Sequence, residues 1–239
     1  HSSGNHGAAL SLAAQNRGIP ASIVMPSNTP AVKQAAVRAY GGKITFCRPT
    51  LEDREKTAHD IELQTGATLI HPYNDFRMIE GHGTAVVELL EEISDLDLIM
   101  VPTGGGGLLS GTLIAAKGLR KDIQVIGAEP AGADDAYRSW KAGELVPLEK
   151  ADTIADGLRT SLGDKTFPII RELVDGMVLA SEKAIIEAMR LVMERMKIVI
   201  EPSAAVPLAA LLEKQVDVSG RRVGIILSGG NVDLSTLPV

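Results

Sequence analysis

The chain has 239 residues, of which 45% are hydrophobic, so it can bury a core in one large domain or two smaller ones. Its formal net charge of -6 leaves no basic field that would attract nucleic acid or an anionic membrane, and its apolar runs are far shorter than a membrane span. The single cysteine excludes an internal disulfide and a cysteine-based zinc site. We therefore expect a cytoplasmic protein that acts on small molecules.

Short runs of β-branched residues alternate with longer amphipathic stretches, which is the pattern of βα units. In the first third we expect helices at 8–16, 31–40 and 52–64, and strands at 21–25, 43–47 and 68–71. Beyond a loop at 72–78 we expect helices at 83–93, from the glycine-rich turn through 117, and at 133–142, 182–196 and 204–213, with strands at 98–101, 124–128 and 223–227. The sequence thus predicts an α/β fold with two open, twisted, mostly parallel sheets flanked by helices, in a small domain (1–74) and a large domain (75–239).

The chain opens with the run Ser-Ser-Gly-Asn-His-Gly at residues 2–7, directly before a predicted helix. Small residues let the backbone approach a ligand closely, and free amides at a helix N-terminus can hold a carboxylate or phosphate. This run is therefore predicted to be an anion cradle. Because no initiator methionine and no strand precede it, we also expect an N-terminal portion of the large domain to lie before residue 1.

Four successive glycines follow the predicted strand at 98–101 and precede a helix, namely Gly104, Gly105, Gly106 and Gly107. They are costly in conformational entropy, so a purely structural turn rarely needs them, although a flexible turn is the alternative. Their amides could converge on a phosphate at the positive end of the helix. The spacing matches neither a dinucleotide fingerprint nor a Walker loop.

A third glycine-bearing segment, Leu-Ser-Gly-Gly-Asn at 227–231, follows the last predicted strand. Ligands of open α/β sheets gather at the carboxyl ends of strands, so this segment and the tetraglycine loop can face one crevice. The Ser228 hydroxyl could meet a ring nitrogen there. A plain turn explains the same residues equally well.

Together these loops resemble those of the pyridoxal-phosphate enzymes of fold type II, the tryptophan synthase β-like fold, in its serine racemase and serine/threonine dehydratase branch. The segments 127–130, 153–157, 194–197 and 200–202 carry the same resemblance, in consistent order over nearly the whole chain. It implies that the four glycines bind the cofactor phosphate, that Asn5 hydrogen-bonds the ring oxygen and that Ser228 contacts the pyridine nitrogen. The same resemblance implies a homodimer.

The resemblance also implies that Ser2, Ser3, Gly4 and His6 surround the carboxylate of an amino-acid substrate. Arg54 resembles an arginine that reaches this carboxylate when the small domain closes, although a solvated charge among acidic neighbours is an equal interpretation. Ser3 discriminates within the branch, because many threonine dehydratases have alanine at its position. In serine racemases the hydroxyl of this second serine can return a proton to the opposite face of the α-carbon.

Glu129, Ala133 and Asp135 resemble the divalent-cation site of the family, which uses two carboxylates and a backbone carbonyl. Such oxygen ligands suit Mg²⁺, Ca²⁺ or Mn²⁺ rather than zinc. From the residues alone, a helix N-terminal aspartate and an ordinary loop glutamate are the simpler interpretation.

The chain departs from the family in lacking the lysine that carries the cofactor, which lies in a Phe-Lys-x-Arg-Gly context before the Ser-Ser-Gly-Asn run. We expect that lysine before residue 1; the alternative is a non-catalytic protein that binds pyridoxal phosphate or an amino acid. Ala8 stands where racemases often have glutamine, which puts nucleotide activation in doubt. Tyr73 stands where many have asparagine, which leaves the substrate preference open.

The function that we expect is a pyridoxal-phosphate-dependent dehydratase of a small β-hydroxy amino acid such as serine, threonine or 3-hydroxyaspartate, which gives an α-keto acid and ammonia. Racemisation of serine or aspartate through Ser3 is the alternative enzymatic activity. Both begin with removal of the α-proton, so one site could support both.

Overall fold

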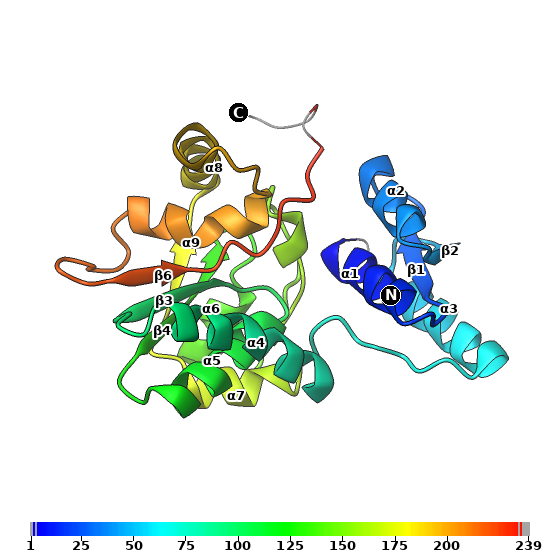
Figure 1. The fold of residues 1–239 in the computed structure, drawn as a ribbon, viewed down its shortest axis with the longest axis horizontal. Coiled ribbons are helices and arrows are strands. Elements are labelled where there is room, and N and C mark those ends of the chain that lie inside the picture. Colours follow the sequence, from blue (N-terminus) through cyan, green and yellow to red (C-terminus); the bar gives the residue numbers. More distant parts are fainter. Residues whose placement is uncertain (1, 3, 234, 236–239) are drawn as a thin grey trace. The chain divides into compact units, whose positions relative to one another are not determined.

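The computed structural model describes residues 2, 4–233 and 235. It divides into two compact units (Figure 1), each of which is considered by itself. Unit 1 contains the described residues up to Pro72 and those from Asn231 onward, and unit 2 runs from Tyr73 to Gly230. In the part of the chain that is described, no helix has both the length and the apolar character needed to cross a bilayer.

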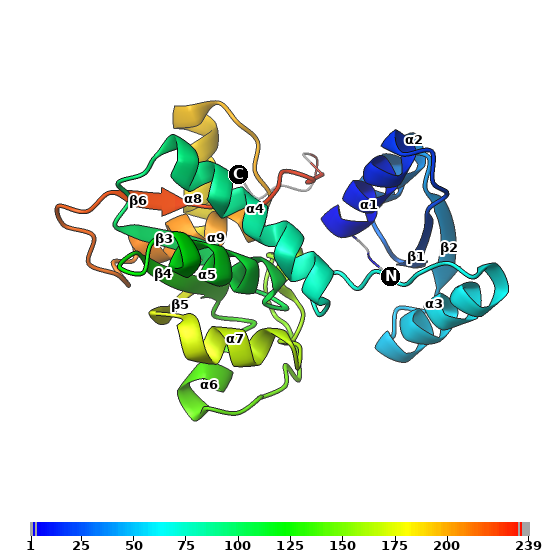
Figure 2. The same ribbon diagram turned by 60° about the horizontal axis from the view of Figure 1, so that its bottom comes forward.

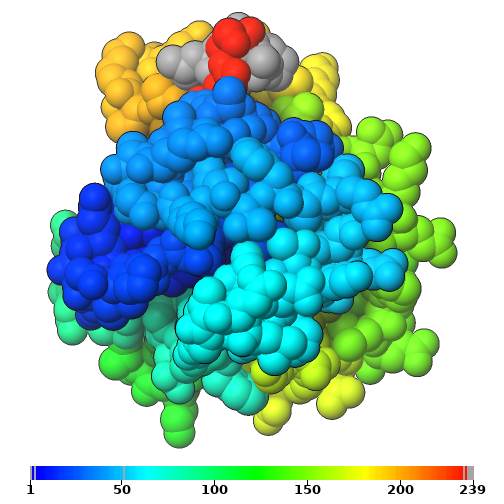
Figure 3. Space-filling model, turned by 90° about the vertical axis from the view of Figure 1, so that its right-hand side faces the viewer, coloured from blue at the N-terminus to red at the C-terminus, as the bar shows by residue number. Residues whose placement is uncertain are grey.

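Unit 1 is built on two parallel strands, β1 (Ser22–Pro26) and β2 (Lys43–Cys47), paired from Ser22 opposite Lys43. The helices α1 (Asn5–Asn16) and α2 (Ala31–Ala39) contribute Ala8 and Val37 to a small core that also contains Ile23 and Met25 of β1. The helix α3 (Leu51–Thr65) contacts both strands. Figure 2 shows the strands and helices of this unit, and Figure 3 shows its surface in blue to cyan.

The prediction of a strand at residues 68–71 is wrong, because these residues form no strand. β1 pairs with β2 on one side, and a hollow lined by residues 19–24 and 67–70 lies along it. Residues 68–71 therefore have no strand beside them with which to form a ladder. The Ile70 carbonyl instead lies 3.2 Å from Nε2 of His6.

Unit 2 contains a four-stranded parallel sheet in the order β5-β4-β3-β6. Its strands are β3 (Leu98–Pro102), β4 (Gln124–Pro130), β5 (Gly176–Ala180) and β6 (Val223–Ile225). Its helices are α4 (Phe76–Glu92), α5 (Gly107–Leu119), α6 (Asp135–Ala142), α7 (Thr166–Leu173), α8 (Glu182–Met196) and α9 (Pro202–Leu212), with a short 3-10 helix at Asp156–Leu158.

The central strand β3 is buried along its whole length, because helices cover both faces of the sheet (Figure 1). Its side chains alternate between two cores. Leu98 and Met100 pack with residues of α8 and α9, whereas Ile99 and Val101 pack with residues of α4, α5 and α7. This packing on both faces fixes the position of the strand whose C-terminal end carries the glycines.

Candidate functional site

The strand order of unit 2 places the tetraglycine loop at a reversal of the sheet. From β3 the chain proceeds to β4 and β5 on one side, and β6 lies on the other side of β3. The loop follows β3 and Ser228 follows β6, with Met100 opposite Ile225 in the register. Open α/β sheets bind ligands outside the carboxyl ends of the strands at such a switch point. Both segments therefore lie at the same edge of the sheet, and that they face one ligand stays a prediction.

The backbone of the tetraglycine loop presents free hydrogen-bond donors at the start of α5. Gly104, Gly105, Gly106 and Gly107 are all buried. Among the described residues, the amides of the first three donate no hydrogen bond, although the carbonyls of Gly105 and Gly106 accept them. Buried amides are normally paired, so this row of donors at the positive end of a helix fits an anion such as a phosphate.

Neighbouring side chains leave no room for β-carbons on this loop. Gly106 has a φ of +84°, and an added β-carbon would lie 2.8 Å from atoms of Ile170 and Leu162 and 2.9 Å from Cβ of Thr166. The ring of Tyr73 lies directly against Gly105, and Leu158 and Thr160 lie against Gly104. Only glycine combines this backbone conformation with this close approach.

In unit 1, the predicted anion cradle forms the N-terminus of α1. The Ser2 hydroxyl accepts hydrogen bonds of 3.2 Å from the amides of Gly4 and Gly7, which fixes the turn that enters the helix. The side-chain oxygen of Asn5 accepts a 2.6 Å bond from Asn231. His6 lines the hollow beside β1. The predicted catalytic residue Ser3 lies outside the described residues.

Arg54 lies on α3, and its Nε is buried without a hydrogen-bond partner among the described residues. It lies close enough to Cys47 to lower the pKa of that thiol, although burial outweighs this effect and raises the pKa. A buried guanidinium nitrogen without a partner is costly, so this arrangement fits an arginine that receives an anionic ligand.

Glu129, at the end of β4, accepts backbone hydrogen bonds from Ala136 (3.2 Å) and Tyr137 (2.7 Å) of α6. Burial, followed by the charge of Asp135, raises the pKa of Glu129 well above its ordinary value. Burial also raises the pKa of Asp135 to about 6. One Asp135 carboxylate oxygen accepts from Leu162, while Oδ1 is buried and without a partner among the described residues.

Two buried carboxylates and one unpaired oxygen favour a bound cation at this position. The third predicted ligand, Ala133, is also buried and lies in the loop that joins β4 to α6. No group of three or more His, Cys, Asp or Glu side chains within the described structure could hold a metal ion. A cation here would therefore need backbone oxygen or water to complete its shell.

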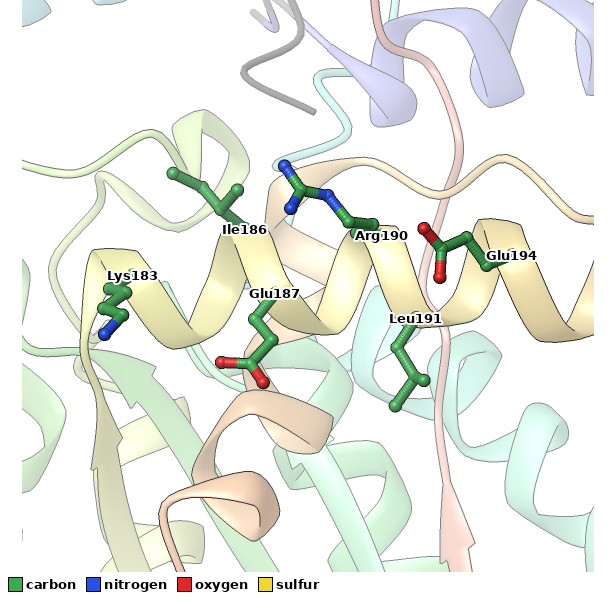
Figure 4. A pocket seen from close by; sticks show the side chains of 6 residues that line it. All are labelled: Lys183, Ile186, Glu187, Arg190, Leu191 and Glu194. Carbon is green, nitrogen blue, oxygen red and sulfur yellow. The ribbon is translucent and has the colours of Figure 1, made fainter.

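Two hollows lie away from the tetraglycine loop. One, of about 740 Å³ and largely apolar, lies in unit 1 along β1 and includes Ser2 and His6. The other, of about 410 Å³, lies along α8 (Figure 4). Its side chains carry both signs of charge, and they are Lys183, Ile186, Glu187, Arg190, Leu191 and Glu194. None of the predicted site residues lines this second hollow.

The family model described as "Pyridoxal-phosphate dependent enzyme" matches residues 1–229. The chain belongs to this family. A serine racemase of Arabidopsis thaliana is 50% identical over 99% of this chain and 73% of its own length, and a beta-hydroxyaspartate dehydratase of Paracoccus denitrificans is 47% identical over 100% and 76%. The solved structure of maize serine racemase is 48% identical, with a TM-score of 0.96 over 99% of this chain and 74% of that one.

These relatives confirm the resemblance drawn from the motifs, the fold type and the cofactor class. Sequence reasoning did not identify the side chains that pack around the tetraglycine loop, of which Thr166 makes the most direct contact: its hydroxyl donates a 2.9 Å bond to the Gly105 carbonyl. The ring of Tyr73, which from the sequence is only a departure from the family, also lies against this loop. A threonine at the start of a short helix carries no sequence signal for such a contact.

Proposed function

We propose that the protein is a pyridoxal-phosphate-dependent dehydratase of a small β-hydroxy amino acid, which releases an α-keto acid and ammonia. The observation that carries this proposal is the row of buried, unpaired amides at Gly104, Gly105 and Gly106. In this proposal they bind the cofactor phosphate together with the N-terminus of α5. When bound, the cofactor supplies the electron sink that stabilises negative charge at the substrate α-carbon.

Ser228 is proposed to hold the pyridine nitrogen, and Asn5 the ring oxygen. A serine hydroxyl is neutral, so it does not keep a ring nitrogen protonated as a carboxylate would. The substrate carboxylate is proposed to bind at Ser2, Ser3, Gly4 and His6, with Arg54 as its charged partner. The helix N-terminus at Gly4 and the unpaired Nε of Arg54 support this assignment.

Racemisation is the second candidate function. Serine racemases are among the most similar relatives, and a solved relative that is 37% identical is an aspartate racemase. The sequence supplies Ser3 as the residue that would return a proton to the opposite face of the α-carbon. We propose Ser3 as the acid for this step. When no proton is returned to the α-carbon, the β-hydroxyl group leaves instead and elimination follows.

Both activities are tested in one experiment. L-serine, L-threonine and 3-hydroxyaspartate are incubated with the protein and pyridoxal phosphate in deuterated water, and keto acid and both enantiomers are quantified. Keto acid from any of the three supports the dehydratase, and deuterium in the inverted enantiomer supports the racemase. Ser3→Ala should abolish inversion and spare elimination of the L-substrate. Neither product from any substrate would contradict the proposed function.

We further propose that Glu129, Asp135 and the Ala133 carbonyl bind Mg²⁺, Ca²⁺ or Mn²⁺. The buried, unpaired Oδ1 of Asp135 supports this site. Adding each cation to chelator-treated protein should raise its melting temperature, and Asp135→Asn should remove the increase. Asp122→Asn is the matched control, because Asp122 is an exposed aspartate of the same unit. An equal increase in melting temperature for the unmodified protein, Asp135→Asn and Asp122→Asn would contradict the site.

That two copies of the chain form a homodimer stays a prediction, which analytical ultracentrifugation tests.

A further inference from the structure

Thr166 is the first residue of α7 and is completely buried. Its hydroxyl oxygen accepts a 2.9 Å hydrogen bond from the Gly163 amide. As a donor it lies 2.9 Å from the Gly105 carbonyl and 3.2 Å from the Gly163 carbonyl. A hydroxyl has one proton, and Gly105 offers the nearer acceptor. Thr166 therefore connects the start of α7 to the second glycine of the loop.

This bond fixes the orientation of the peptide group between Gly105 and Gly106. In a trans peptide the carbonyl and the following amide point in opposite directions. With the Gly105 carbonyl held toward α7, the Gly106 amide must point away from α7. That amide has no hydrogen-bond acceptor among the described residues, so it is available to a ligand.

Packing around Gly106 limits where the loop can lie but does not set the orientation of its peptide group. Side chains of α7 and of the loop before it lie within 3 Å of the position that a Gly106 β-carbon would take, and they are Leu162, Thr166 and Ile170. These side chains block movement of the loop toward α7, but they are apolar at the contact and cannot select the direction of a carbonyl. Within the described structure, the Thr166 hydroxyl is the one group that hydrogen-bonds the Gly105 carbonyl.

We infer that Thr166 is a positioning residue for the cofactor phosphate: its hydroxyl holds the Gly105 carbonyl so that the Gly106 amide is directed at the phosphate. The inference rests on the proposed function, because it assumes that the tetraglycine loop binds this phosphate. Thr166 itself does not touch the ligand. Loss of the Thr166 hydroxyl should weaken the binding of ligands that carry the phosphate and leave the binding of ligands without a phosphate almost unchanged.

The experiment compares binding of pyridoxal phosphate with binding of pyridoxal, which lacks the phosphate, by fluorescence titration. Thr166→Val removes the hydroxyl and keeps the shape, whereas Thr166→Ser keeps the hydroxyl. Thr112→Val is the matched control, since Thr112 is a buried threonine of α5 whose hydroxyl has no partner among the described residues. We expect Thr166→Val to weaken the binding of pyridoxal phosphate about tenfold and the binding of pyridoxal less than about twofold.

Thr166→Ser should bind pyridoxal phosphate within about threefold of the unmodified protein, and Thr112→Val should bind it equally well. If Thr166→Val does not fold, Thr166→Ala and Thr166→Ser make the same comparison, because both lack the methyl group and only serine keeps the hydroxyl. Equal weakening of both ligands, or of neither, would overturn the inference. Failure of the proposed function looks different: the unmodified protein would then bind the two ligands equally.

Discussion

Replacing Gly106 by alanine tests whether the tetraglycine loop has the conformation on which its proposed role depends. The φ of +84° places the residue in the left-handed region, where a β-carbon costs about 1–2 kcal/mol. The β-carbon would also lie 2.8–2.9 Å from Leu162, Thr166 and Ile170, and overpacking of this kind costs about 1–3 kcal/mol. We therefore expect Gly106→Ala to lower the free energy of unfolding of unit 2 by about 2–5 kcal/mol.

Urea unfolding measures this loss, and the single tryptophan, Trp140, reports on unit 2 from α6. With a urea dependence of about 2 kcal/mol per molar, the midpoint should fall by about 1–2.5 M. Gly118→Ala is the matched control: Gly118 lies on α5, the helix that follows Gly106, with nothing within 4 Å of its added β-carbon. That substitution should raise the free energy of unfolding by about 0.5–1 kcal/mol. An unchanged midpoint in Gly106→Ala would mean that the loop tolerates a β-carbon at this position.

Three further predictions concern unit 2. Burial lowers the pKa of His82 below its usual value of 6.5, so the unfolded state binds the His82 proton first as the pH falls; in urea titrations from pH 8 to 5 the unmodified protein should lose stability relative to His82→Gln below pH 6.5, and a constant difference between the two would contradict this. Met100→Ala should lower the free energy of unfolding by about 2–5 kcal/mol and exposed Leu119→Ala by far less. Ser181→Ala removes the N-cap of α8 and should cost about 1 kcal/mol, measured the same way.

Much of the fold follows from the hydrophobic pattern along the chain. The strand at 43–47 and the helix at 182–196 have the predicted bounds, because alternation and helical spacing are strong in both. The strand at 68–71 failed because a ladder needs a neighbouring strand, which a local pattern cannot supply. The strand β5 (Gly176–Ala180) and the helix α7 (Thr166–Leu173) are not among the expected elements, since each is short, with 5 and 8 residues.

The candidate site, like the fold, could be predicted from the sequence only in part. Backbone chemistry can be recognised in a sequence when it needs glycine, so the tetraglycine loop was found directly. The contact of Thr166 with Gly105 joins residues 61 positions apart and depends on how α7 packs against α5. Burial of Glu129 and Asp135 likewise depends on the arrangement of β4 and α6, so the sequence alone favoured an ordinary loop acid at this place.

A crystal structure of the protein with pyridoxal phosphate would test whether the tetraglycine loop binds the cofactor phosphate. We expect phosphate oxygens within about 2.7–3.2 Å of the amide nitrogens of Gly104, Gly105 and Gly106, with the Gly105 carbonyl still bonded to Thr166. A phosphate held elsewhere by basic side chains, with these three amides still unpaired, would contradict it.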